Sequence, residues 1–160
     1  MNILHTNKEN LVAVHKNEHE PYEYIKHQVT PRKPGMKTMV AFYEIPPMKA
    51  NYPLHSHLTS EEVFYILEGC GTLETLEGNV LIQAGDIVVC PCGEGNAHRI
   101  VNTGDQPLRY LDVDTVSDLD LVEYPESKKI GVIRNGSPSR FYRKDDDVDY
   151  YLGECPGFFI

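Results

Sequence analysis

The sequence contains no tryptophan, four cysteines and no apolar stretch that approaches the ~18 residues of a membrane-spanning helix. Membrane insertion is therefore not expected. Residues 1–20 are too polar for a secretory signal peptide, so the cytoplasm is the expected location. Because that compartment is reducing, we expect Cys70, Cys90, Cys92 and Cys155 to be free thiols.

Positive charge is scarce as well. Fifteen Lys and Arg residues stand against twenty-four Asp and Glu, which gives a net charge of −9 with neutral histidines. Because such an acidic chain repels phosphate backbones, nucleic acid is not an expected partner. The length of 160 residues suits one domain, and the content of 41% hydrophobic and 24% charged residues is that of an ordinary globular protein.

Turn-forming residues are frequent, with twelve Gly and eleven Pro. Between residues 36 and 114 they separate short β-rich segments at intervals of roughly ten residues, a pattern typical of an antiparallel sandwich or barrel. These segments are residues 37–45, 62–67, 71–76, 80–83, 86–90, 98–102 and 108–113. We expect an all-β chain with an N-terminal arm over residues 1–35 and a C-terminal extension over residues 115–160, in which only residues 117–123 have weak helical character.

Residues suited to metal binding occur in two stretches of the central region. His55 and His57 stand two positions apart, so in a strand both imidazoles project from the same face. Glu62 begins the next apolar segment, and the intervening turn can bring its carboxylate beside them. With His98 from a later segment, the three imidazoles and one carboxylate would suit a divalent first-row metal and leave positions open for substrate. The alternative is structural or surface histidines, the more common role of a single histidine in a strand.

The two stretches resemble the two sequence motifs of the cupin family. The first is His55-x-His57-x4-Glu62-x6-Gly69, and the second is Gly85-x5-Pro91 followed by Gly95-x2-His98-x3-Asn102. The second motif departs from the family pattern by two extra residues before Asn96, which lengthen a loop at the barrel mouth.

The resemblance implies a double-stranded β-helix, a small jelly-roll barrel spanning residues 36–114, with terminal extensions. It implies one divalent transition metal per chain (Zn, Fe, Mn, Ni, Co or Cu), held inside the barrel by His55, His57, Glu62 and His98. It also implies a small-molecule ligand or substrate and a homodimer, in which the C-terminal extension packs on the barrel or on the partner.

Strand alternation then predicts which neighbours of the ligands face inward. If Glu62 points into the barrel, Phe64 and Ile66 do so too, and Val63, Tyr65 and Leu67 form an outward apolar row. Such a row requires cover from a second sheet layer, a terminal arm or a dimer partner.

Residues 117–132 and 149–154 are similar to a narrower group of small bacterial cupins that carry the name sugar-phosphate isomerase. Three functions remain open: a metal-dependent sugar or sugar-phosphate isomerase, a metal-dependent dioxygenase, and a non-catalytic binding or sensing protein. An isomerase needs an acid/base group and, for a phosphate, a cation. The candidates by composition are the tyrosines Tyr43, Tyr52 and Tyr110 and the cations Lys37, Lys49 and Arg109.

Overall fold

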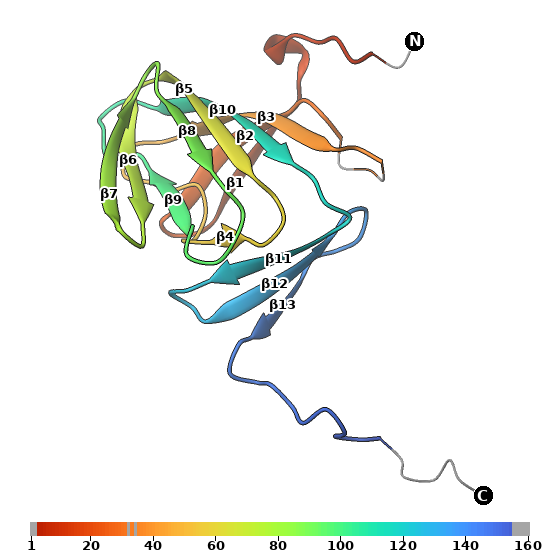
Figure 1. Ribbon diagram of the computed structural model, residues 1–160. Helices are drawn as coiled ribbons and strands as arrows, with labels where there is room; N and C mark the ends of the chain where they lie inside the picture. Colours follow the sequence, from red (N-terminus) through yellow and green to blue (C-terminus); the bar gives the residue numbers. More distant parts are fainter. Residues whose placement is uncertain (1–2, 32, 34, 155–160) are drawn as a thin grey trace, which may run out of the picture.

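The computed structural model describes residues 3–31, 33 and 35–154 (Figure 1). Within this part of the chain nearly all regular structure is β-strand, and no helix is long or apolar enough to cross a membrane. The elements are η1 (Lys8–Asn10), β1 (Ala13–His19), β2 (Tyr22–Gln28), β3 (Thr38–Ile45), β4 (Ser56–His57), β5 (Glu62–Glu68), β6 (Cys70–Thr75), β7 (Gly78–Gln83), β8 (Ile87–Cys90), β9 (His98–Val101), β10 (Leu108–Thr115), β11 (Leu119–Tyr124), β12 (Lys129–Arg134) and β13 (Arg140–Arg143).

Two antiparallel sheets form the barrel (Figure 1). The larger has the strand order β1-β2-β3-β10-β5-β8, and the smaller has the order β7-β6-β9. Strands β3 and β10 bury alternate residues, which is the pattern of a strand with one face on a core. This confirms the expected all-β jelly-roll fold. Strands β1 and β2, from the first 35 residues, extend one edge of the larger sheet.

The inward faces of both sheets make one core. Its buried members are Ala41, Tyr43, Ile45, Phe64, Ile66, Ile82, Cys90, Ile100, Leu108 and Tyr110. Alternation along β5 is as predicted, because Glu62, Phe64 and Ile66 are buried, whereas Tyr65 and Leu67 are 42% and 40% exposed. That a partner covers this outward row stays a prediction.

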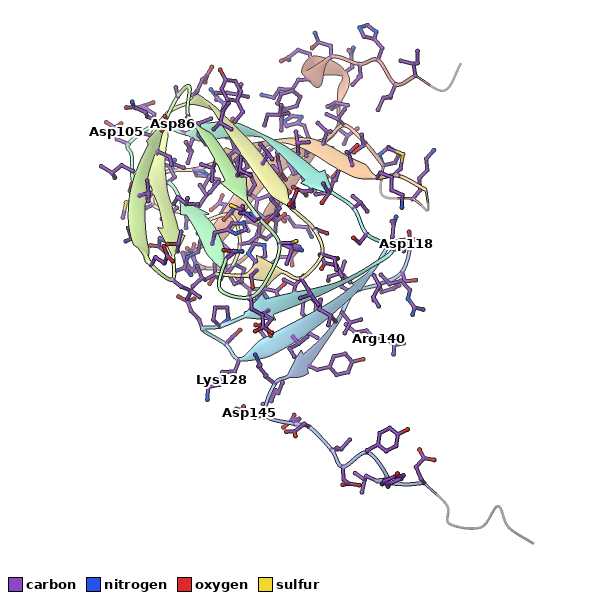
Figure 2. All side chains as sticks on the ribbon, in the orientation of Figure 1. Asp86, Asp105, Asp118, Lys128, Arg140 and Asp145 are labelled. Carbon is purple, nitrogen blue, oxygen red and sulfur yellow. The ribbon has the colours of Figure 1, made fainter. Side chains whose placement is uncertain are left out.

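The C-terminal extension adds three strands, which pair with β4 in a four-stranded sheet of order β13-β12-β11-β4 at the end of the barrel that holds the first histidine motif. The helical character expected for residues 117–123 is wrong, since residues 119–124 form strand β11. Asp120 and Val122 are buried on one face of β11, and that period of two belongs to a strand. Figure 2 shows Asp86 and Asp105 at the opposite end of the barrel, away from this sheet.

Candidate metal centre

Three imidazoles surround one carboxylate at the end of the barrel covered by β11 and β12. His55 and His57 flank the first residue of β4, and Glu62 and His98 are the first residues of β5 and β9. The Nε2 atom of His98 lies 2.7 Å from Oε2 of Glu62, that of His57 lies 3.7 Å from Oε1, and that of His55 lies 3.9 Å from Oε2. The structure therefore brings the Nε2 atoms of all three histidines within 4 Å of the Glu62 carboxylate, and the ligand atoms of His55, Glu62 and His98 within 4.8 Å of one another.

Backbone pairing sets the position of two of the imidazoles. The amide N of His55 donates to the carbonyl O of His98 at 3.2 Å, and the amide N of His98 donates to the carbonyl O of His55 at 2.9 Å. Residues more than forty positions apart are thereby held side by side. The longer loop of the second motif also packs here, because the amide N of Gly93 donates to the carbonyl O of His57 at 2.7 Å.

Each imidazole uses its outer nitrogen to fix its orientation. The Nδ1 atom of His55 donates to the carbonyl O of Pro53 at 2.9 Å, and that of His98 donates to the carbonyl O of Asn96 at 3.0 Å. Since a carbonyl oxygen only accepts, both Nδ1 atoms carry a proton, so Nε2 is the nitrogen that a neutral ring would offer to a metal. This is the arrangement that protein metal sites use to fix the ligating tautomer.

The third imidazole has a carboxylate partner that sequence analysis missed. Oδ2 of Asp120 accepts from Nδ1 of His57 at 2.6 Å, while Oδ1 of Asp120 accepts from the amide N and the hydroxyl of Thr59, both at 2.9 Å. Asp120 lies on β11, whose Val122 pairs with His57. If residues 119–124 had been assigned to a strand, Asp120 would have been placed on the same face as Val122 and could have been recognised as a candidate site residue.

The donor atoms at the centre suit a metal ion. Oε2 of Glu62 and Nε2 of His98 are buried, and their alignment makes no hydrogen bond despite their proximity. Burial lowers the pKa of His55 to about 4, so this imidazole is neutral at pH 7. Burial alone would raise the pKa of Glu62, but the contact with His98 and the nearby imidazoles lower it, which keeps the carboxylate ionised. Neutral imidazole and ionised carboxylate are the ligating forms.

Beside this cluster the barrel holds a cavity of about 380 Å³. His55, His57 and Glu62 line one wall. Val122 and Tyr124 of β11, together with Ile133 of β12, line the side formed by the C-terminal sheet. The volume lies in the ~300–1,000 Å³ range of small-molecule sites.

Two aspartates complete the polar wall of the cavity, and sequence analysis missed them as well. Asp112 and Asp114 face inward on β10, and their carboxyl oxygens lie within 4.8 Å of each other and of Glu62. Burial and the charge of Asp114 raise the pKa of Asp112 well above its ordinary value, and burial also raises the pKa of Asp114 to about 6. The sequence signal that could have revealed them is the period of two along β10, which puts both aspartates on the same face as Leu108 and Tyr110.

None of the three cations suggested by composition lines this cavity. The Nζ atom of Lys49 donates to the carboxylate of Glu20 at 2.6 Å, Arg109 pairs with Glu44 at 2.7 Å, and Lys37 is exposed. The cation that does line it is Lys26 of β2, whose Nζ lies 4.9 Å from the ring centre of Tyr43.

Two of the three tyrosines suggested by composition line the cavity, and the third does not. The hydroxyls of Tyr43 and Tyr52 are hydrogen-bonded to each other at 2.9 Å, and both residues line the cavity. Tyr110 lies behind Tyr43, with parallel rings 5.1 Å apart, and is 1% exposed. Burial raises the pKa of all three hydroxyls, so they are neutral hydrogen-bonding groups at pH 7.

The remaining titratable features lie outside the cavity wall. Cys90 has a buried free thiol, and its backbone lies opposite that of Glu62 in the pairing of β5 with β8. Cys92 has a partly buried free thiol. Cys70 is also free, as expected, while Cys155 lies outside the described residues.

The barrel topology and the group of three histidines and one glutamate at its mouth can be compared with those of known protein families. Residues 41–114 match the family described as Cupin domain. Residues 41–114 are therefore a cupin domain, in agreement with the sequence motifs.

Two curated relatives match the barrel. MJ1618, an uncharacterized protein from Methanocaldococcus jannaschii, is 37% identical over 48% of this chain and 59% of its own length. The oxalate-binding protein of Thermotoga maritima is 37% identical over 47% of this chain and 60% of its own length. The matches thus span about three fifths of these relatives.

A solved structure matches more of the chain. The protein from Acidithiobacillus ferrooxidans, provisionally named a sugar phosphate isomerase, has a TM-score of 0.77 and 26% identity. The alignment covers 88% of this chain and 90% of that one, so the similarity includes strands outside the barrel core.

Proposed function

We propose that this protein is a metal-dependent enzyme acting on a small polar molecule in the barrel cavity. Its metal is one divalent transition ion per chain, held by His55, His57, Glu62 and His98. The observation that carries the proposal is the convergence of three imidazole Nε2 atoms on one buried carboxylate beside a cavity of about 380 Å³. This donor set suits first-row divalent ions.

The reaction that the cavity supports best is isomerisation of a hydroxycarbonyl compound. When bound, the metal polarises the carbonyl oxygen of such a compound. Asp112 and Asp114 supply a base on the adjoining wall, within 4.8 Å of Glu62. The base takes the proton from the carbon next to the carbonyl and returns it to the former carbonyl carbon, while a proton passes between the two oxygens, so nothing else is consumed. The isomerase name of the Acidithiobacillus protein gives independent support.

This proposal predicts a metal-containing protein that works without oxygen. Untagged protein, purified without chelating resin, should contain close to one transition-metal ion per chain by elemental analysis. Under anaerobic conditions in D2O it should interconvert at least one aldose–ketose pair and incorporate solvent deuterium, because the moving proton exchanges on the base. Protein stripped with a chelator is the control.

The other open functions give different results in the same assays. Consumption of oxygen with no anaerobic turnover would identify a dioxygenase. Stabilisation by ligand without turnover would identify a binding protein, with ~2.7 kcal/mol expected at 100 times the dissociation constant. A protein that takes up no metal on reconstitution contradicts the proposed function altogether.

The substitution Asp120→Asn should weaken metal binding by roughly 10- to 100-fold, the usual effect of losing a ligand's outer partner. The neutral amide no longer holds the Nδ1 proton of His57 with a full negative charge, so Nε2 is a weaker and less ordered ligand. Zinc affinity measured by competition with a chromophoric chelator tests this.

Asp118→Asn is the matched control, because Asp118 is exposed and stands two positions away on the same segment. Its zinc affinity should equal that of the wild type. An Asp120→Asn protein that melts normally and binds zinc within twofold of the wild type would show that this carboxylate does not orient the ligand.

A further inference from the structure

The cavity wall next to the candidate metal site is built from three neighbouring strands, β2, β3 and β10, and the middle strand carries a small residue, Ala41. Ala41 of β3 pairs with Gln28 of β2 on one side and with Asp112 of β10 on the other. Gln28 and Asp112 both line the cavity. In the next row Lys26 pairs with Tyr43, and both line the same cavity.

The wall contains two buried carboxyl oxygens that have no hydrogen-bond partner in the described part of the chain. Oδ1 of Asp112 and Oδ1 of Asp114 are buried and make no hydrogen bond within the described residues. Asp112 and Asp114 are only 4% and 6% exposed. Buried polar atoms are almost always paired, and leaving one unpaired costs ~1–3 kcal/mol. A ligand that brings hydroxyl groups to these oxygens would supply the missing donors.

The charges in the cavity oppose a strongly anionic ligand. Glu62, Asp112 and Asp114 contribute three carboxyl groups to its lining. Among the described residues that line it, Lys26 is the single cation and no arginine is present. Lys26 already interacts electrostatically with both aspartates and partly offsets the rise that burial causes in the pKa of each.

Charge balance decides between two classes of ligand. With a divalent ion held at Glu62, Lys26 remains the single described cation beside the carboxyl groups of Asp112 and Asp114. A phosphate ester carries ~1.5–2 negative charges at pH 7 and is held in proteins by arginine forks or by groups of backbone N–H donors. Among the described residues that line the cavity there is no such arginine fork, and a phosphate turned toward Asp112 and Asp114 would meet like charges.

We propose, building on the proposed function, that the cavity binds a neutral polyhydroxylated carbonyl compound, an unphosphorylated aldose or ketose. Its carbonyl end lies at His55, His57 and Glu62, and its hydroxyls donate to Asp112 and Asp114. The rings of Tyr43, Tyr52 and Tyr124 give the cavity an aromatic lining on which the C–H face of a sugar can pack. The substrate class thus differs from the phosphate ester in the name of the Acidithiobacillus protein.

The experiment compares each sugar with its own phosphate ester on metal-loaded protein. Calorimetric titration uses the pairs ribose and ribose 5-phosphate, glucose and glucose 6-phosphate, and fructose and fructose 6-phosphate, all at one ionic strength. We expect at least one free sugar to bind ten or more times more tightly than its ester. Asp112→Asn should weaken the binding of that sugar and reduce its preference over the ester, whereas the exposed control Asp118→Asn should leave both unchanged.

Three results would overturn the substrate class: an ester that binds more tightly than its free sugar, a panel in which no free sugar binds, or an Asp112→Asn protein with unchanged preference. The metal content of each sample is measured in parallel. Metal-loaded protein that prefers an ester refutes the substrate class and leaves the proposed function standing, whereas protein that takes up no metal refutes the proposed function itself.

Discussion

Replacing His98 with alanine should reduce the metal affinity of the protein by more than ~100-fold, because loss of a direct ligand exceeds the 10- to 100-fold cost of losing an outer partner. His98 makes the shortest approach to Glu62, at 2.7 Å, and its Nδ1 atom is fixed by Asn96. No other imidazole of the cluster can take its place, because the carbonyl of Pro53 fixes His55 and the carboxylate of Asp120 fixes His57. Elemental analysis after dialysis against a weak chelator should find the variant essentially free of metal.

The matched control is His19→Ala, which removes an exposed imidazole at the end of β1 and should leave metal content unchanged. A second variant, His98→Gln, keeps a polar side chain near Glu62 and separates loss of metal from loss of fold. Retention of one tightly bound ion per chain in a folded His98→Ala protein would contradict the assignment of the site.

The metal cluster could be predicted from the sequence because its geometry is local. His55 and His57 share a face through the period of two, and Glu62 follows after one turn. Only the position of His98 depends on a long-range contact, and the spacing of the second motif supplied it through the family resemblance. Inward and outward residues of β5 followed from the same alternation.

The walls of the cavity could not be predicted in this way. Lys26 and Asp112 of the cavity wall, and Asp120 beside His57, come from three strands that meet only when the sheets form, and none belongs to a recognisable motif. The rule that inward positions of a strand are apolar also hides Asp112, because a carboxylate is not expected at an inward position. Such conflicts between local pattern and fold are expected at functional sites, where polar groups are retained at a cost in stability.

Asn102 closes the other end of the barrel, and its replacement by alanine should lower the free energy of unfolding by about 3 kcal/mol. The side chain is fully buried, and its Nδ2 atom donates to the carbonyl O atoms of Ile45 at 2.7 Å and Gln106 at 2.8 Å. Its Oδ1 atom accepts from the amide N of Gly104 at 3.0 Å. Alanine leaves the carbonyl of Ile45 on β3 buried without a partner and removes two partly buried hydrogen bonds to the turn between β9 and β10.

A loss of this size corresponds to a fall in melting temperature of roughly 6–12 °C for a domain of this length, which calorimetry or urea titration resolves. Asn79→Ala, at an exposed position of β7, should change stability by less than ~0.5 kcal/mol. Asn102→Asp keeps the acceptor for Gly104 but sets a carboxylate against two carbonyl oxygens, so it should cost at least as much as alanine. If Asn102→Ala melted like Asn79→Ala, the three hydrogen bonds would contribute nothing net. Metal content should remain that of the wild type, because Asn102 and the metal cluster lie at opposite ends of β9 and the adjoining turn.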